Sequence, residues 1–140
     1  MKGRNDILNS CIFCKIINDE LESKKIYEND YVLAFLDISN DADGHTLVIP
    51  KKHVRNLLDC DENTMQEVMK AIQKIMHHYK SKGYEGFNLI CSNEPAGEQS
   101  IFHLHFHIYP RKSDDGMRVF PKLSNSQHTL EEMCEFLKLN

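Results

Sequence analysis

The chain has 140 residues, with 17 Lys and Arg against 21 Asp and Glu, which gives a formal charge of −4 at pH 7. Its 41% hydrophobic and 27% charged residues are typical of a folded domain with a buried core, and exclude a disordered or fibrous chain. The acidic balance argues against nucleic acid as a partner, because that affinity depends on clustered Lys and Arg. This length predicts one domain over residues 1–140.

No apolar run approaches the roughly 20 residues that a membrane helix needs. The first ten residues, MKGRNDILNS, lack the apolar stretch and cleavage site of a secretory signal. We therefore expect a cytoplasmic protein that does not bind membranes. Its five cysteines are then expected to be reduced thiols or metal ligands, because disulfides are rare in that compartment. Eight histidines are the unusual count.

The first predicted elements are a short helical turn and two strands. A CxxC segment at 11–14 is followed by an apolar turn at 15–17. Two β-rich runs come next, at 31–37 and 45–50, and the segment between them, 39–44, is rich in turn-forming residues. We expect the two runs to pair as antiparallel strands.

One long helix is predicted after these strands. Thr64 followed by Glu67 has the pattern of a capping box, Asp61 is an alternative N-cap, and Gly83 is suited to end the helix. The apolar residues between them recur every three or four positions and form one stripe that should face the core. These residues are Met65, Val68, Met69, Ile72, Ile75, Met76 and Tyr79.

Two more strands and a terminal helix complete the pattern. The runs 87–92 and 101–109 are predicted strands, separated by the loop 93–100. Thr129 with Glu132 predicts a second helix start near the C-terminus. Strands linked antiparallel with helices packed on them make an α+β domain. The short stripe of the last helix consists of Leu130, Met133, Cys134 and Leu137.

Three histidines alternate along the predicted strand 101–109. Side chains alternate between the faces of a strand, so His103, His105 and His107 should share one face. A solvent-exposed strand face would not need three crowded imidazoles. Shared metal binding is hindered because same-face neighbours lie about 7 Å apart. Covalent catalysis is the other reading, since a neutral imidazole is a nucleophile whose neighbours can steer a phosphate.

The loop before these histidines has the composition of a phosphate-binding loop. Gly97 permits close approach of the backbone to a ligand. Gln99 and Ser100 add an amide and a hydroxyl, uncharged groups that can hold a phosphate without trapping it. An ordinary turn is the alternative for such a loop.

The CxxC pair, Cys11 and Cys14, indicates a metal site. A redox pair would need the βαβ context of a thioredoxin, which the predicted pattern does not offer. Two thiolates need two further ligands for a closed tetrahedral zinc site, and His53 and His103 could supply them. The other three cysteines are expected to be small buried or half-buried residues: Cys60, Cys91 and Cys134.

The run from His103 to Tyr109 resembles the His-φ-His-φ-His-φ-φ signature of the histidine-triad (HIT) superfamily of nucleotide hydrolases and transferases. The resemblance extends over about residues 11–111 and leaves 112–140 as a variable tail. It implies a HIT-like α+β fold, a mainly antiparallel sheet of about five strands with one long helix and short terminal helices. The segments that resemble the family, in order, are 11–17, 34–38, 44–53 and 93–111.

The resemblance also implies roles for individual residues. His105 would attack the α-phosphate of a purine nucleotide, forming a nucleotidyl-histidine that water then hydrolyses. His107 would contact phosphate or orient the nucleophile, His45 would support it from the neighbouring strand, and Ser100 would protonate the leaving group. The implied substrate-binding residues are Asp37 at the ribose hydroxyls, Phe35 and Ile38 at the base, and Asn93, Gln99, Ser100 and His107 on the phosphate side.

Similarity to bacterial-type members implies one structural zinc ion per chain on Cys11, Cys14, His53 and His103, and a homodimer joined partly through the long helix and an adjacent strand. The expected substrate is an adenosine phosphoramidate or a diadenosine polyphosphate. A nucleotide-binding sensor or scaffold with negligible turnover is the alternative, disfavoured by the intact His105. A zinc-dependent hydrolase is also disfavoured, because four protein ligands close the metal shell.

Overall fold

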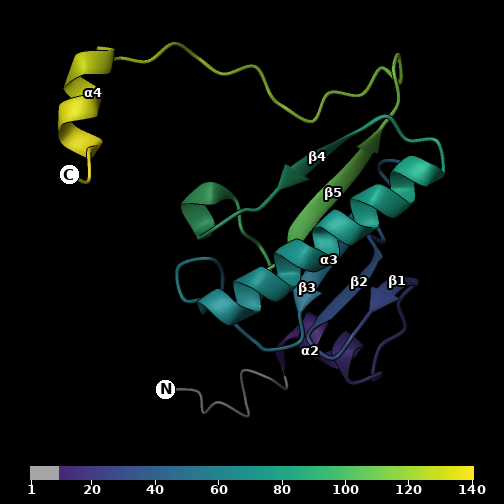
Figure 1. The fold of residues 1–140 in the computed structure, drawn as a ribbon. Helices are drawn as coiled ribbons and strands as arrows, with labels where there is room; N and C mark the ends of the chain where they lie inside the picture. Colours follow the sequence, from purple (N-terminus) through teal and green to yellow (C-terminus); the bar gives the residue numbers. More distant parts are fainter. Residues whose placement is uncertain (1–9) are drawn as a thin grey trace.

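The computed structural model describes residues 10–140, and its centre is a five-stranded sheet in the order β1-β2-β3-β5-β4 (Figure 1). Every neighbouring pair of strands is antiparallel, so the predicted α+β class is confirmed. The first strand mixes polar and apolar residues, is mostly exposed, and was not among the predicted elements. The strands are β1 (Lys25–Glu28), β2 (Val32–Leu36), β3 (Thr46–Pro50), β4 (Gly86–Ile90) and β5 (Phe106–Arg111).

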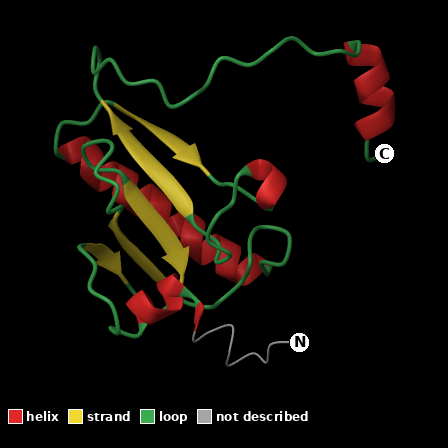
Figure 2. Cartoon of the chain, turned by 180° about the vertical axis from the view of Figure 1, so that it is seen from behind, coloured by secondary structure: helices red, strands yellow, loops and turns green. Residues whose placement is uncertain are grey.

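The helices lie on both sides of this sheet. The long helix α3 (Glu62–Ser81) covers one face, where its apolar stripe packs on alternate residues of β2, β3 and β5 (Figure 1). Figure 2 shows the opposite face, with the short helix α2 (Ile12–Ile17) at one end of it. There Phe13 and Ile16 pack on the other set of alternate residues of β2 and β3. The two cores hold the sheet rigidly between them.

The ends of α3 follow from local hydrogen bonding. Asp61 is the N-cap, because its carboxylate accepts the backbone N–H of Thr64 at 3.0 Å. The alternative cap is therefore the correct one, and Thr64 lies inside the helix. At the other end Gly83 has φ +104°, a left-handed conformation that glycine adopts without strain. The predicted end of the helix is confirmed.

The strand with the histidines begins later than the pattern predicted. Leu104 donates its backbone N–H to the Val54 carbonyl at 2.8 Å instead of to a neighbouring strand, so β5 starts only at Phe106. The alternation of side chains nevertheless extends upstream of β5. Leu104 and Phe106 point into the core under α3, while His103 and His105 contact Phe13 on the side of α2. The predicted sharing of one face is correct, although only one of the three histidines is in the strand.

The tail after β5 extends away from the sheet and ends in α4 (Leu130–Leu137) (Figure 1). Thr129 caps α4 as predicted, accepting the N–H of Glu132 at 3.1 Å. The apolar stripe of α4 is not buried: Leu130 is 85% exposed. Cys134 is exposed as well, contrary to the expectation of a buried or half-buried thiol. Within residues 10–140, no helix is both long and apolar enough to cross a membrane.

Candidate functional site

His105 is held in one tautomer by the backbone. Its side chain is only 6% exposed, and Nδ1 lies 2.7 Å from the carbonyl oxygen of His103. A carbonyl oxygen can only accept, so Nδ1 carries the proton and Nε2 has a free lone pair. Burial lowers the pKa of His105, which outweighs the opposing effect of that hydrogen bond. The ring is therefore a neutral imidazole with its nucleophilic nitrogen fixed.

A second pair of histidines lies beside it. His107 Nδ1 is 2.8 Å from His45 Nε2, and the rings of His105 and His107 are 5.1 Å apart. His45 is buried just before β3, its Nδ1 lies 2.7 Å from a carboxylate oxygen of Asp41, and its ring stacks on Tyr109 at 4.1 Å. Burial, reinforced by the two neighbouring histidines, lowers the pKa of His107 to about 4. Near neutral pH this imidazole is uncharged.

The predicted metal ligands converge from three segments. Cys11 caps α2, Cys14 lies within it, His53 follows β3, and His103 precedes β5. The sulfur-to-Nδ1 distances are 3.4 Å for Cys11 to His103, 3.3 Å for Cys14 to His53 and 3.6 Å for Cys14 to His103. The two Nδ1 atoms are 3.1 Å apart. The four donor atoms lie within 4.8 Å of one another, so this group could hold a metal ion.

The chemistry of these donors fits a tetrahedral zinc ion. Bonds of about 2.3 Å to sulfur and about 2.0 Å to nitrogen give tetrahedral edges of roughly 3.3–3.8 Å between those ligand atoms. His103 Nε2 donates to the Pro50 carbonyl at 2.8 Å, so its Nδ1 lone pair faces the thiols. Burial and the neighbouring Cys11 thiol raise the pKa of Cys14 to about 12. A bound dication would supply the charge that deprotonates such a buried thiol pair.

The residues expected to contact the nucleoside differ in how deeply their side chains are buried. The Asp37 carboxylate lies 3.8 Å from His45 and also accepts the backbone N–H of Ser39 at 2.8 Å. Phe35 is buried and packs edge-on against Phe13, with ring centres 5.7 Å apart. Ile38 is 94% exposed, so its side chain walls no enclosed base pocket within this chain. The structure brings Asp37 to the histidines and leaves Ile38 outside.

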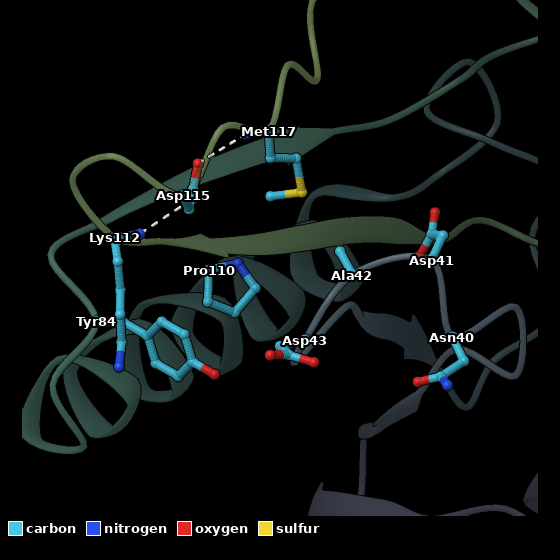
Figure 3. Close-up of a pocket in the computed structure, with 9 residues that line it drawn as sticks. All are labelled: Asn40, Asp41, Ala42, Asp43, Tyr84, Pro110, Lys112, Asp115 and Met117. Atoms are coloured by element: carbon cyan, nitrogen blue, oxygen red, sulfur yellow. Dashed lines mark hydrogen bonds between the residues drawn. The ribbon is translucent and has the colours of Figure 1, made fainter.

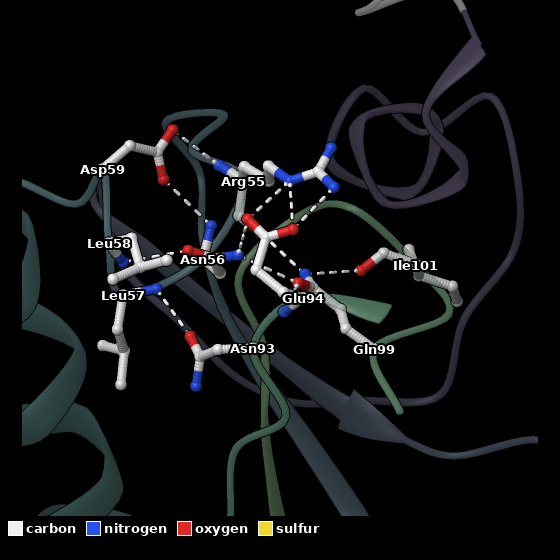
Figure 4. Close-up of polar contacts among 9 residues, drawn as sticks. All are labelled: Arg55, Asn56, Leu57, Leu58, Asp59, Asn93, Glu94, Gln99 and Ile101. Carbon is white, nitrogen blue, oxygen red and sulfur yellow. Dashed lines mark hydrogen bonds and ion pairs between the residues drawn. The ribbon is translucent and has the colours of Figure 1, made fainter. Parts of the chain in front are cut away.

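The two amides expected at the phosphate make hydrogen bonds within the protein (Figure 4). Gln99 is buried, donates to the carbonyls of Arg55 and Ile101, and accepts from Asn56 and from the backbone of Glu94. Asn93 accepts the backbone N–H of Leu57 at 2.8 Å. Both side chains therefore pin the loop after β4 to the loop after β3, and their contacts with a phosphate stay a prediction.

Sequence reasoning missed the other members of this network. Arg55 makes a two-point contact to the Glu94 carboxylate, with its shortest N–O distance at 2.8 Å (Figure 4). Glu94 has φ +67° and ψ 161°, a region used almost only by glycine. The ion pair and the bond from its backbone to Gln99 hold that strained backbone. A long-range partner of this kind leaves no signal in local sequence.

Two hollows lie near the histidines, and Ser100 lines the smaller of them. Ser100 is exposed and lines a hollow of about 300 Å³ with Cys11 and His53. A larger hollow of about 470 Å³ lies between the turn before β3 and the segment after β5 (Figure 3). Two of its lining residues contact His45: Asp41 bonds to the ring, and the Ala42 carbonyl accepts the backbone N–H at 3.2 Å, but His105 is not among the lining residues. The large hollow is therefore not the site of the His105 nucleophile.

An antiparallel α+β domain that gathers alternating histidines on one face is a histidine-triad architecture. The chain belongs to the HIT domain family, whose model matches residues 18–114. It is 42% identical to the uncharacterized HIT-like protein MJ0866 of Methanocaldococcus jannaschii, covering 91% of this chain and 98% of that protein. The family resemblance seen in the sequence is confirmed.

Two further relatives carry functional descriptions. The adenosine 5'-monophosphoramidase hnt1 of Schizosaccharomyces pombe is 34% identical over 106 residues, covering 76% of this chain and 77% of that protein. A zinc-bound histidine-triad protein from Mycobacterium smegmatis has a similar structure, with a TM-score of 0.76 and 31% identity over 84% of this chain and 86% of that one. The monophosphoramidase activity and the bound zinc ion are properties of these two relatives.

Proposed function

We propose that the protein hydrolyses purine nucleotides next to the α-phosphate through a covalent intermediate on His105. The observation that carries this proposal is the hydrogen bond from His105 Nδ1 to the His103 carbonyl, which leaves Nε2 as the nucleophile. Nε2 bonds to the α-phosphorus while the P–N or P–O bond to the leaving group breaks, and the leaving group keeps the bonding electrons. Water then displaces His105 and releases the nucleoside monophosphate.

The surrounding residues are proposed to act on different parts of the substrate. Asp37 would bind the ribose hydroxyls, and the base would lie against the exposed Ile38 side chain, next to the buried Phe35. Ser100 would give a proton to the leaving group. His107, supported by His45, would contact the phosphate or orient the nucleophile. The activity named for the S. pombe relative supports a phosphoramidate as the substrate class.

Quenched-flow mass spectrometry tests the intermediate directly. Mixing the protein with adenosine phosphoramidate or a diadenosine polyphosphate should yield, within the first turnover, an adduct of AMP mass on the peptide that contains His105. Comparing the two substrates ranks the leaving groups in the same experiment. Turnover without any adduct would contradict covalent catalysis, and AMP binding without turnover of either substrate would favour the sensor.

We also propose that the four-ligand group holds one structural zinc ion. The distances among its donors and the zinc-bound M. smegmatis relative support this choice of metal. Cys11, Cys14, His53 and His103 would bind the ion and tie α2 to the two segments that flank the catalytic histidines. All four positions of a tetrahedral shell would be filled by protein, so the ion would have a structural role.

A homodimer is proposed through α3 and the edge of β4. β4 is the last strand of the sheet, and next to it an apolar hollow of about 510 Å³ is lined by Met69, Met76 and Leu89. Met69 and Leu89 are both exposed in the single chain, which is unusual for two large side chains on neighbouring elements. A second copy would bury these side chains and complete the hydrogen bonds of the strand edge.

Leu89→Asp should therefore convert the dimer to monomers. A carboxylate buried without a partner costs several kcal/mol, which corresponds to at least a hundredfold weaker association. Light scattering after size exclusion would measure the mass over a range of concentrations. Leu123→Asp, the same change at an exposed leucine of the tail, is the matched control. A Leu89→Asp protein that remains dimeric would argue against this interface.

A further inference from the structure

A chain of three groups leads from the histidine cluster toward solvent. The Asp41 carboxylate accepts from His45 Nδ1 at 2.7 Å, and His45 Nε2 meets His107 Nδ1 at 2.8 Å. Tyr109 stacks on His45 and donates its hydroxyl to the second Asp41 oxygen at 3.5 Å. The two histidines are mostly buried, whereas the Asp41 side chain is 48% exposed.

The direction of the hydrogen bonds follows from the ionised end of this chain. Burial raises the pKa of Asp41, but hydrogen bonding, chiefly with His45, outweighs this, so the pKa is lowered overall. An ionised carboxylate only accepts, so His45 Nδ1 must carry a proton. In the neutral tautomer that carries its proton on Nδ1, His45 has a bare Nε2, which accepts from His107 Nδ1. As a result, His107 presents Nε2 as an unprotonated base.

We propose that Asp41 is a positioning residue which, through His45, makes His107 Nε2 the proton-accepting end of a relay. The inference rests on the proposed function and concerns its second step. Water bonds to phosphorus through its oxygen and gives one proton to His107 Nε2, while the P–N bond to His105 breaks and its electrons return to His105 Nε2. The Nδ1 proton of His107 passes to His45 Nε2. Afterwards that proton returns to His107 Nδ1, and the proton taken from water leaves His107 Nε2 for solvent.

The relay places the positive charge where the structure tolerates it. His107 is faced by the rings of His105, His45 and Tyr109, with Asp37 and Asp41 further away. An imidazolium there would be buried beside two other histidines. On His45 the same charge lies 2.7 Å from Asp41 and 3.8 Å from Asp37. Charge therefore moves outward, to the ring that has carboxylate partners.

Asp41→Asn tests the relay, because the amide keeps the size of the side chain but loses its charge. Asp43→Asn is the matched control, since Asp43 has no hydrogen bond or ion pair to either histidine within residues 10–140. We expect Asp41→Asn to lower the rate of intermediate hydrolysis about tenfold to a hundredfold, a range set by general base catalysis. The AMP adduct on His105 should consequently accumulate, and KM should not rise.

The pH profile separates this role from a merely structural one. The Asp41 charge favours the protonated form of the histidine pair, so its removal should move the acidic limb of kcat to lower pH. An unmoved limb, or a variant as active as Asp43→Asn, would overturn the relay. Slower adduct formation with unchanged adduct hydrolysis would overturn it too.

A nitrogen-15 NMR measurement of the free zinc-loaded protein tests the relay without any substrate. His107 should be protonated at Nδ1 near pH 7.5 in the wild type and in Asp43→Asn, and should show mixed tautomers in Asp41→Asn. Wild-type His107 protonated at Nε2, or equal tautomer populations in all three proteins, would overturn the inference. If no nucleotide is hydrolysed, the proposed function fails while this result still decides the tautomer.

Discussion

Replacing His105 with Ala should abolish turnover of both an adenosine phosphoramidate and a diadenosine polyphosphate. The covalent step has no substitute nucleophile, since His107 offers its Nε2 from a ring centred 5.1 Å away at a different angle. We expect kcat/KM to fall at least about 10⁴-fold, the scale on which loss of a covalent nucleophile acts. AMP binding, measured by calorimetry, should change only severalfold because the other contacts remain.

Two controls make this result specific. His105→Gln keeps most of the volume next to Phe13 and should be equally inactive, which separates lost chemistry from a cavity in the core. His128→Ala removes an exposed imidazole of the tail and should leave the activity at the wild-type level. Undiminished hydrolysis by either His105 variant would exclude the covalent mechanism.

The sequence predicted what depends on local pattern. Alternation places Leu104 and Phe106 on one side and the histidines on the other, and it does so even upstream of the strand. The ends of the helices could be predicted because capping uses residues close in sequence, such as Asp61 and Thr64. The start of β5 could not be predicted, since it is set by the backbone hydrogen bond from Leu104 to Val54, fifty residues earlier.

The same difference between local sequence pattern and long-range contacts decides which residues of the site could be predicted. Cys11, Cys14, His53 and His103 could be grouped because zinc needs a fixed ligand count, and the structure brings their donor atoms together. Gln99 was predicted to contact a phosphate because an amide in a loop suits one. The structure adds a network that the sequence did not indicate, with partners both in a distant loop, at Arg55 and Asn56, and in its own, at Glu94 and Ile101.

Asp41 was not singled out in the sequence, although its carboxylate contacts the histidine cluster. In the sequence it is one of several turn-forming residues between two strands, a context in which Asp normally bonds to its own backbone. Its carboxylate contacts His45, four residues further on, and the pairing of β3 with β5 brings His107 to that pair. Tertiary structure thus turns a residue of ordinary turn chemistry into a neighbour of the catalytic cluster.

Cys14→Ser should release the proposed zinc ion and destabilise the fold. Cys14 is buried within α2, and its sulfur lies within 3.6 Å of Nδ1 of both His53 and His103. Structural zinc stabilises small peptides by about 10–16 kcal/mol, so we expect a loss of several kcal/mol in a domain that has its own core. Elemental analysis should find about one zinc per wild-type chain, and thermal unfolding should show a lower Tm for the variant.

Cys60→Ser is the matched control, because the Cys60 thiol lies outside the metal centre and only donates weakly to the Asp61 carbonyl. It should keep its zinc and nearly all its stability. His103 links the two sites, since one ring nitrogen faces the thiols and its carbonyl fixes the His105 tautomer. Cys14→Ser should therefore also lower turnover below that of Cys60→Ser at a temperature where both are folded. A metal-free wild type with full stability would refute the zinc site.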